Sequence, residues 1–196
     1  MNLPYHHGNL REALLARAIE TLSEEGVEHL TLRGLARDLK VSHAAPLRHF
    51  PTKTDLLNAI AVEGVENLVA ATDTALAHSP GPARLRAMML AYIDWAMHNA
   101  ELHRVLRNPD VMRHASDTLA EMLTAFANRQ KSEISKAQEQ GWRSDEDPAV
   151  LFLHLVSLTA GTAIVMTEDI YRDPVTTPET QDKIAASIDL FLGQGN

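Results

Sequence analysis

The segment KVSHAAPLRHFPTK, from Lys40 to Lys53, gathers side chains that can bind anions and nucleotide bases. Its histidines, arginine and lysines can donate hydrogen bonds to base acceptors or phosphate oxygens, and no acidic residue opposes them. Its alanines are small enough for the backbone to approach thymine methyl groups. This combination is typical of a surface that reads the major groove of double-stranded DNA.

Two short helices within residues 31–50 would position these side chains. Thr31 is placed to cap the first helix, and Val41 and Ser42 form a tight connection. Ser42 can cap a second short helix that ends near Phe50. Such a pair predicts a helix-turn-helix, whose second helix fits a major groove about 12 Å wide. The alternative is a generic helical hairpin with a solvated basic face.

The residue types in this region predict individual DNA contacts. We expect His43, Ala44 and Arg48 near base edges, because they suit base recognition. We expect Thr31 and Lys53, each at the start of a helix, on phosphates. The full set of predicted DNA-binding residues is Thr31, Arg33, Lys40, Ser42, His43, Ala44, Ala45, Leu47, Arg48, His49 and Lys53.

The whole chain has 196 residues, of which 45% are hydrophobic, and a formal net charge of −8. Residues 1–60 are balanced in charge, so the acidic excess lies in the remainder and suggests two domains with different partners. The absence of cysteine excludes disulfides, zinc–thiolate sites and cysteine nucleophiles. Because no run of 18 apolar residues and no signal-peptide pattern occurs, we expect a cytoplasmic protein without a membrane span.

Helical periodicity extends along the whole sequence, and no β-strand pattern of useful length interrupts it. We predict an all-α protein of about nine helices. A helix-turn-helix domain should occupy residues 1–52, a connecting lever helix 53–81, and a helical ligand-binding and dimerisation domain 82–196. Within the last, we expect helices at 82–99, 101–107, 110–140 and 148–170, a loop at 172–179, and a final helix that ends near residue 192.

The stretch TLRGLARDLKVSHAAPLRHFPTKTDLLNAI resembles the DNA-binding domain of TetR-type transcriptional regulators. Thr31 and Lys53 fall on the family's phosphate-contacting threonine and lysine, and His49 with Phe50 falls on the end of its recognition helix. The leading YHHGNLREALLARA and the variant SHAAPLRHF resemble one subgroup of the family. The resemblance implies a homodimer that binds a palindromic DNA operator, responds to a small apolar or amphipathic effector, and acts as a repressor.

Two positions depart from the family pattern. Lys40 stands where the family has a turn glycine, so it must tolerate a left-handed conformation or a modified turn, at a cost of about 1 kcal/mol. Leu47 stands where the family usually has a tyrosine whose hydroxyl reaches a phosphate. Leucine lacks that hydroxyl, so Leu47 either packs in the core or makes an apolar contact at the groove edge.

The resemblance also implies a ligand pocket and a dimer interface in the C-terminal part. The predicted pocket residues are Met88, Tyr92, Trp95, Met122, Phe126, Phe152, Leu155, Thr159 and Thr162. Small residues on one apolar helix, with the last helix, suggest a dimer interface that contains Ser157, Gly161, Ile184 and Ile188. For each of these residues the alternative is an ordinary place in the core.

Ten histidines raise the possibility of an enzyme. His98, His103 and His114 lie on or near adjacent predicted helices and could bind a metal. The sequence contains no His-Glu-x-x-His, no Glu with a His three residues later, and no Gly-x-Ser-x-Gly. We therefore expect no enzyme, no metal and no cofactor. A metal-dependent helical enzyme and a helical adaptor that does not bind DNA stay as alternatives.

Overall fold

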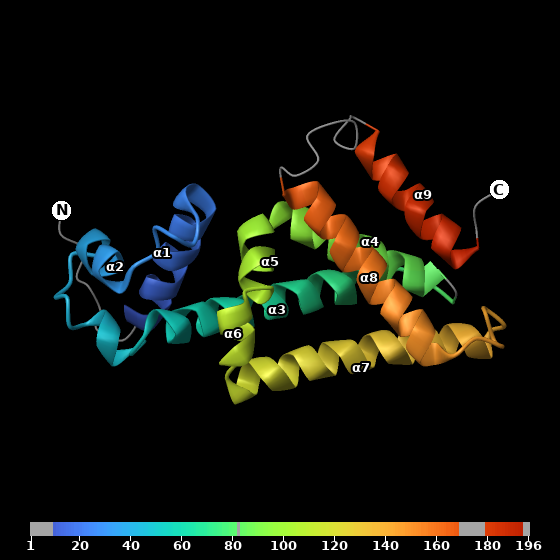
Figure 1. Ribbon diagram of the computed structural model, residues 1–196, viewed down its shortest axis with the longest axis horizontal. Helices are drawn as coiled ribbons and strands as arrows, with labels where there is room; N and C mark the ends of the chain where they lie inside the picture. The colour runs from blue at the N-terminus through green and yellow to red at the C-terminus, as the bar shows by residue number, and fades with distance from the viewer. Residues whose placement is uncertain (1–9, 82, 169–178, 194–196) are drawn as a thin grey trace. The chain divides into compact units, whose positions relative to one another are not determined.

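The structure is a computed structural model that describes residues 10–81, 83–168 and 179–193 (Figure 1). These residues form nine α-helices and one 3-10 helix and contain no β-strand, which confirms the all-α prediction. The expected loop at 172–179 and the motif residues before Leu10 lie almost wholly outside the described residues. The chain divides into a first unit, Met1–Val65 with Ala100–Ala120, and a second unit, Glu66–Asn99 with Glu121–Asn196.

The first unit contains α1 (Leu10–Glu25), α2 (Leu32–Asp38), the 3-10 helix η1 (Pro46–Arg48), α5 (Ala100–Leu106) and α6 (Pro109–Arg113). It also contains the beginnings of α3 (Lys53–Ala77) and α7 (Asp117–Glu139), which both continue into the second unit. Its buried apolar residues include Leu14, Leu22, Leu30, Leu35, Phe50, Leu56, Ile60 and Val105.

Residues 43–50 do not form the short α-helix that the sequence predicts. They form a turn followed by η1, and the backbone bonds from Ala45 N to Ser42 O and from Arg48 N to Ala45 O join residues three apart. The reason is Pro46, which has no N–H to donate to the carbonyl of Ser42. The chain therefore winds more tightly here, as 3-10 segments do.

The single helix expected at 110–140 is divided in two, α6 and α7. The break lies at His114 and Ser116, which are both bound by the buried side chain of Asn58 on α3. Asn58 Nδ2 donates to His114 O over 3.0 Å, and Ser116 N donates to Asn58 Oδ1 over 2.9 Å. Because these backbone groups bond to a side chain, the helix restarts only at Asp117, where Ser116 Oγ accepts from Leu119 N.

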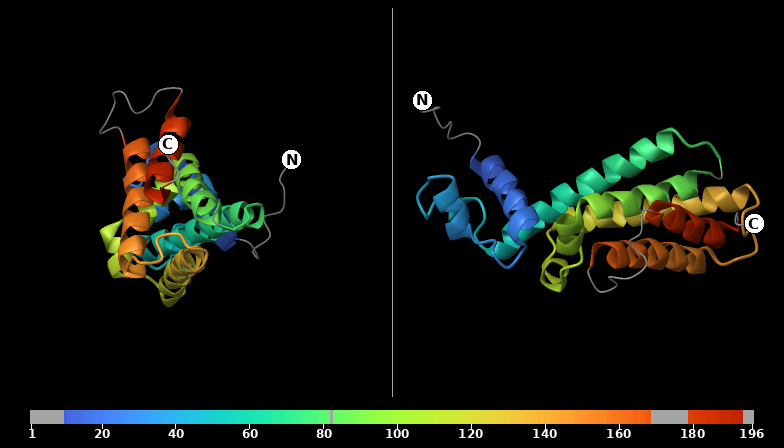
Figure 2. Two further views of the ribbon diagram at one scale, coloured as in Figure 1. Left: turned by 90° about the vertical axis from the view of Figure 1, so that its right-hand side faces the viewer. Right: turned by 90° about the horizontal axis from the view of Figure 1, so that it is seen from above.

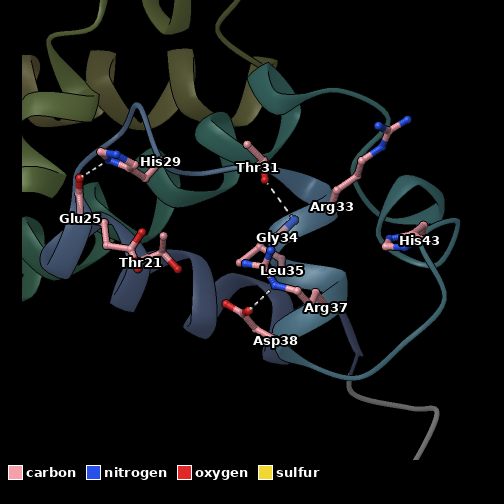
Figure 3. A pocket seen from close by; sticks show the side chains of 10 residues that line it. All are labelled: Thr21, Glu25, His29, Thr31, Arg33, Gly34, Leu35, Arg37, Asp38 and His43. Atoms are coloured by element: carbon pink, nitrogen blue, oxygen red, sulfur yellow. Dashed lines mark hydrogen bonds and ion pairs between the residues drawn. The ribbon is translucent and has the colours of Figure 1, made fainter.

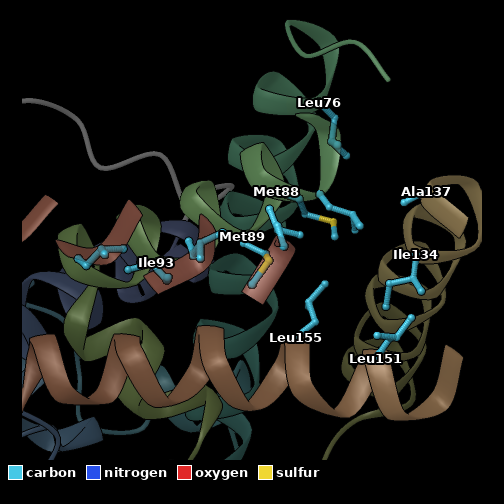
Figure 4. Close-up of a cluster of buried hydrophobic side chains, with 12 residues drawn as sticks. Leu76, Met88, Met89, Ile93, Ile134, Ala137, Leu151 and Leu155 are labelled. Carbon is cyan, nitrogen blue, oxygen red and sulfur yellow. The ribbon is translucent and has the colours of Figure 1, made fainter. Parts of the chain in front are cut away.

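The second unit is a bundle in which α4 (Ala83–His98) packs against both α8 (Pro148–Thr167) and α9 (Thr180–Leu192). Figure 2 shows these helices side by side with α7 from two further directions. Figure 4 shows the core that they share, which includes Met88, Met89 and Ile93 of α4, Ile134 of α7 and Leu155 of α8. Helix α4 is therefore central to this unit, as its almost uniformly apolar sequence predicts.

Two bidentate ion pairs join α4 to its neighbours at the edge of this core. Arg84 donates to both carboxylate oxygens of Glu133 on α7, at 2.8 and 3.2 Å, and Arg86 donates to both of Asp189 on α9. The Glu133 side chain is only 4% exposed. Its hydrogen bonds with Arg84 outweigh the effect of burial and, with those of Lys136, lower the pKa of Glu133 from 4.5 to about 2.

Helix α8 is apolar all round but incompletely covered by its own chain. By length and composition alone it could cross a membrane, and 22% of its most apolar window is buried within the chain. A single helix of this kind is weak evidence for a span. Val150 and Leu153 are 44% and 65% exposed, so the described residues leave one face of α8 uncovered.

Candidate functional site

An open hollow in the first unit brings together many of the predicted DNA contacts. It has a volume of about 710 Å³ and spans the start of α2, the turn before η1, and the start of α3. Its lining residues are Leu30, Thr31, Leu32, Arg33, His43, Ala44, Leu47 and Lys53. Of these, all but Leu30 and Leu32 belong to the predicted DNA-binding set, and none is acidic.

The remaining predicted DNA contacts lie on the same segment and are accessible. Lys40, Ser42, Arg48 and His49 are exposed, whereas Ala45 is half-buried. The segment is held down by Pro46 and by Phe50, which is 2% exposed. The Arg11 guanidinium on α1 lies 5.3 Å from the centre of the Phe50 ring. Buried anchors thus hold a short segment whose other side chains face solvent.

Thr31 caps α2, as the sequence predicts. Its Oγ1 accepts a hydrogen bond from Gly34 N over 3.0 Å, which leaves the hydroxyl proton available to another acceptor (Figure 3). A Cβ added at Gly34 would lie 2.9 Å from that oxygen. A side chain at position 34 would therefore displace the Thr31 hydroxyl, and the predicted site residues did not include this support from Gly34.

Lys53 already has a partner within the first unit. Its Nζ donates to Val27 O over 2.7 Å and so ties the start of α3 to the loop before α2. The ammonium keeps two further N–H donors, so a phosphate contact is still chemically possible. No sequence signal could have revealed this bond, because a backbone carbonyl acceptor is present at every residue.

The two departures from the family pattern have definite conformations. Lys40 has φ of 56°, so of the two expected alternatives it adopts the left-handed conformation. It ends α2, where Lys40 N donates to Arg37 O and Val41 N donates to Ala36 O. Leu47 is 50% exposed and lines the open hollow, so it is not a core residue.

A second hollow of about 410 Å³ lies between α1 and α2 (Figure 3). It shares Thr31, Arg33 and His43 with the first but also contains the carboxylates of Glu25 and Asp38. Asp38 accepts from Arg17 Nε over 3.1 Å, which joins α2 to α1. These carboxylates would repel phosphates, so this hollow is a poorer match to DNA than the first.

The predicted ligand-pocket residues are mostly packed. Met88, Trp95, Leu155 and Thr159 are at most 5% exposed, and Met88 and Leu155 belong to the core cluster. Phe126 is 8% exposed and stacks with the Tyr92 ring at a centroid separation of 6.5 Å. The remaining predicted residues, Met122, Phe152 and Thr162, are half-buried.

An open groove in the second unit lies elsewhere, between α4, α9 and the end of α3, and we call it the α4–α9 groove. Its volume is about 610 Å³. Its lining residues are Ala75, His78, Ser79, Ala87, Leu90, Ala91, Ile93, Asp94, Met97, Gln181, Asp182, Ile184 and Ala185. None of the predicted ligand-pocket residues is among them.

The predicted dimer residues divide into two groups. On α8, Ser157 is exposed, and a Cβ added at Gly161 would meet nothing within 4 Å, so this face is open. On α9, Ile184 and Ile188 are 6% and 1% exposed and belong to the core cluster of their own unit, so the ordinary core place that the sequence left open accounts for them. Their four-residue spacing, continued by Leu192, faces α4, whereas Leu190 is 76% exposed.

The histidines considered as metal ligands have other surroundings. His98 and His114 are exposed, and in each the ring Nδ1 lies within hydrogen-bonding distance of the carbonyl four residues earlier. His103 is buried. Within residues 10–81, 83–168 and 179–193 no three His, Asp or Glu side chains are grouped to hold a metal ion.

Comparison with known proteins agrees with the geometry of the first unit. Residues 14–60 match the family model of bacterial regulatory proteins of the tetR family. The nucleoid occlusion factor SlmA of Haemophilus influenzae is 28% identical over 158 residues, which cover 77% of this chain and 72% of that protein.

Solved structures extend the similarity to the whole chain. A protein of unknown function from Rhodococcus sp. RHA1 is 31% identical, with a TM-score of 0.82 and 98% of each chain covered. A regulatory protein of the tetR family from Rhodococcus RHA1 is 24% identical, with a TM-score of 0.71 and coverage of 94% of this chain and 95% of that one. The latter similarity concerns the fold alone.

TetR-family proteins are transcriptional regulators rather than enzymes, and they typically bind operator DNA as dimers and respond to small-molecule ligands. The matched residues 14–60 contain the whole open hollow and its anchors. The chain belongs to the TetR family of bacterial regulatory proteins and is a DNA-binding regulator of transcription.

Proposed function

We propose that the open hollow of the first unit, from Thr31 to Lys53, is the surface that contacts the operator. The supporting observation is that Thr31, Arg33, His43, Ala44, Leu47 and Lys53 line one hollow without a carboxylate. Arg48 and His43 are assigned to base edges, and Thr31 and Lys40 to phosphates. Lys53 has two roles, since its bond to Val27 also positions the helices that carry the other contacts.

The operator is a palindrome that two copies of the chain read together. The exposed face of α8, with Val150, Leu153 and Ser157, and the exposed Leu190 of α9 form the contact between the copies. A two-fold dimer presents two equal reading surfaces, so adjacent half-sites are about 34 Å apart along the DNA. Burial of this face in the dimer accounts for an apolar helix that its own chain leaves partly uncovered.

The regulated step is a shift between two populations of the dimer. Residues 1–52 bind DNA, residues 53–81 form the lever, and residues 82–196 bind the effector and the second copy. Helix α3 runs unbroken from Lys53 to Ala77 and belongs to both units, so it can carry a displacement from one to the other. An effector that binds more tightly to the arrangement with poor DNA contacts shifts the population towards it and so weakens repression. The size of this shift depends on the difference between the effector's affinities for the two arrangements. We place the protein in the cytoplasm and assign it no catalytic activity.

Selection of DNA by the purified protein tests this function without knowledge of the operator. The protein is mixed with a pool of random duplexes, the bound fraction is amplified over several rounds, and the enriched sites are measured by fluorescence anisotropy. We expect a palindromic site, and sedimentation should show two chains per duplex. Failure of the pool to enrich any site would contradict the assignment.

A variant pair ties the result to the proposed surface. Arg48→Ala removes an exposed side chain of the reading segment, and Arg37→Ala removes an exposed arginine of α2 outside the open hollow. Only Arg48→Ala should strongly weaken binding to the selected DNA site. For the dimer, Leu153→Glu should abolish two-chain assembly, whereas an unchanged sedimentation coefficient would place the contact elsewhere.

A further inference from the structure

The α4–α9 groove has the size and lining of a small-molecule site. Its volume of about 610 Å³ lies within the range of roughly 300–1,000 Å³ that is usual for ligand pockets. The apolar wall consists of Ala87, Leu90, Ala91 and Met97 on α4 and Ala185 on α9. Leu90, Ala91 and Met97 are only half-buried, so a bound apolar group would remove further surface from water.

The charged groups of this groove have one sign. Asp94 on α4 and Asp182 on α9 line it, and no lysine or arginine is among the lining residues. The Asp94 side chain is 63% exposed, and its Oδ1 lies 3.4 Å from His98 Nδ1. Both carboxylates therefore keep contact with solvent at the rim, above an apolar floor.

We propose that the α4–α9 groove is an effector site for a small organic cation, with a protonated amine or quaternary ammonium group on an apolar body. The apolar body lies along Leu90, Ala91 and Met97, and the cationic group lies near Asp94 and Asp182. This charge pattern repels an anionic ligand such as a carboxylate or a phosphate ester. The inference rests on the proposed function, since it specifies the class of effector.

The position of the groove also connects it to regulation. Its lining includes Ala75 and His78 at the C-terminal end of α3, the helix whose first residue, Lys53, lies in the open hollow. A ligand in the groove therefore contacts directly a helix that continues into the DNA-binding unit. No other element between them is required for coupling.

The described polar contacts that join α9 to other parts of its unit lie in its C-terminal half, beyond the residues that line the groove. Asp189 is bound by Arg86, Phe191 O accepts from Arg143 Nη2, and Leu192 O accepts from Trp142 Nε1 over 2.9 Å. Gln181, Asp182 and Ala185, which line the groove, lie before all these contacts.

Three probes with the same eight-carbon chain separate charge from apolar binding: octyltrimethylammonium, octyl sulfate and 1-octanol, all below the concentrations at which they aggregate. Affinities are measured by calorimetry on the full chain. Methionine-methyl NMR locates the site, because Met97 lines the groove while Met88 and Met89 lie in the core. Met97→Leu identifies its signal. We expect the cation to bind most tightly, to shift the Met97 signal, and to weaken binding of the selected duplex.

Substitution of the two carboxylates tests the electrostatic part. The double variant Asp94→Asn with Asp182→Asn should lower the affinity for the cation by about tenfold, since each exposed charge contributes modestly. The affinity for octanol should stay the same. Glu121→Gln, an exposed carboxylate of α7 outside the groove, is the matched control and should have no effect. Ala91→Phe, which fills the groove, should lower the affinities for the cation and for octanol alike.

Three results would overturn the inference: equal or tighter binding of octyl sulfate, a Met97 signal that does not move, or cation affinity unaffected by the double variant. Each would leave the proposed function intact if the unliganded protein still enriches and binds a palindromic duplex. Loss of that DNA binding would instead overturn the proposed function, whatever the groove binds.

Discussion

The two units present opposite kinds of exposed surface. In the first unit the exposed side chains from Lys40 to His49 are mostly cationic or small, and they stand on buried Pro46 and Phe50. Among the described residues, the large apolar side chains that are exposed lie mostly in the second unit, namely Val150, Leu153 and Leu190, whereas the first unit has Leu47. A surface for DNA must keep its donors accessible, whereas a surface for another copy of the chain gains from apolar area that only the complex buries.

The polar interactions that support these surfaces differ in the same way. In the first unit Thr31, Lys53 and Asn58 bind backbone groups, and a single carboxylate–guanidinium pair, Arg17–Asp38, is described between its helices. The second unit also has side chains that bind backbone, but two bidentate carboxylate–guanidinium pairs join its helices, of which Arg84–Glu133 is the more buried. Bonds to backbone fix the path of short irregular segments, and ion pairs fix the contact between long regular helices. The predictions below test this difference.

Acid should destabilise the second unit through Glu133, and this is the largest effect that we expect. Because the folded-state pKa is lowered to about 2, the stabilisation is complete above pH about 4.5 and is lost as the pH falls from there to about 2. Its size is about 3 kcal/mol. Urea unfolding between pH 3 and 7, followed by Trp95 and Trp142, which both lie in the second unit, measures this loss.

The variant Glu133→Gln supplies the reference for this measurement. The difference in unfolding free energy between wild type and variant should shrink as the pH falls, because only the wild type has this carboxylate. Asp189→Asn is the matched comparison. The pKa of Asp189 is also lowered, mainly by its hydrogen bonds with Arg86, but its side chain is 26% exposed, so its effect should be smaller. A constant difference for Glu133→Gln would contradict the prediction.

Some local features of the first unit were predictable from sequence, whereas its departures from regular helix were not. Thr31 as a cap and the left-handed Lys40 followed from local chemistry, since caps and turns depend on a few neighbouring residues. Helical periodicity predicts an α-helix where η1 forms, because periodicity does not register that Pro46 lacks an N–H. The break at His114 depends on Asn58, which lies far away in sequence, so no local pattern indicated it.

The second unit shows why faces of apolar helices are hard to assign. Helix α8 is apolar on every side, so periodicity could not distinguish Leu155, which is buried, from Leu153, which is exposed. On α9 the regular spacing of Ile184 and Ile188 did mark a buried face, and within the chain that face packs against α4. A stripe of apolar residues predicts burial without identifying the partner.

Loss of one base contact should be the next largest effect. Arg48→Ala should cost about 1–3 kcal/mol in binding to the selected duplex and relax its sequence preference. Because Arg48 is exposed, the melting temperature should stay the same. Lys53→Ala should differ from Arg48→Ala both in its effect on sequence preference and in its effect on melting temperature, since it also removes the bond to Val27. It should lower the melting temperature and weaken all duplexes alike, and a variant with unchanged stability would show that the bond to Val27 contributes nothing.

Relief of backbone strain should have a smaller effect, of opposite sign for stability and binding. Lys40→Gly removes the side chain from a residue with φ of 56° and should stabilise the protein by up to about 1 kcal/mol. The same change removes a cation from the DNA-binding segment and should reduce the salt dependence of binding. Lys40→Ala is the control, because it removes the charge but keeps the strain. Equal melting temperatures for the glycine and alanine variants would contradict the strain argument.

The smallest expected effect is a gain of one hydrogen bond at Leu47. This side chain is 50% exposed in the open hollow, so a larger ring can be accommodated without overpacking. Leu47→Tyr adds a hydroxyl where the family's tyrosine reaches a phosphate, and binding should tighten by up to about 1 kcal/mol. Sequence preference should change little, because phosphate contacts position the protein rather than specify bases. Anisotropy with the selected duplex and thermal unfolding are measured on the same variant.

Leu47→Phe separates the hydroxyl from the ring at this position. Phenylalanine adds the same ring without a donor, so it should leave affinity near that of the wild type. Neither variant changes the charge, and the slope of affinity against salt concentration should therefore be the same for both. Equal gains for Tyr and Phe would mean that Leu47 meets DNA through apolar contact alone. A fall in melting temperature for both would mean that the exposed position seen for Leu47 does not persist in solution.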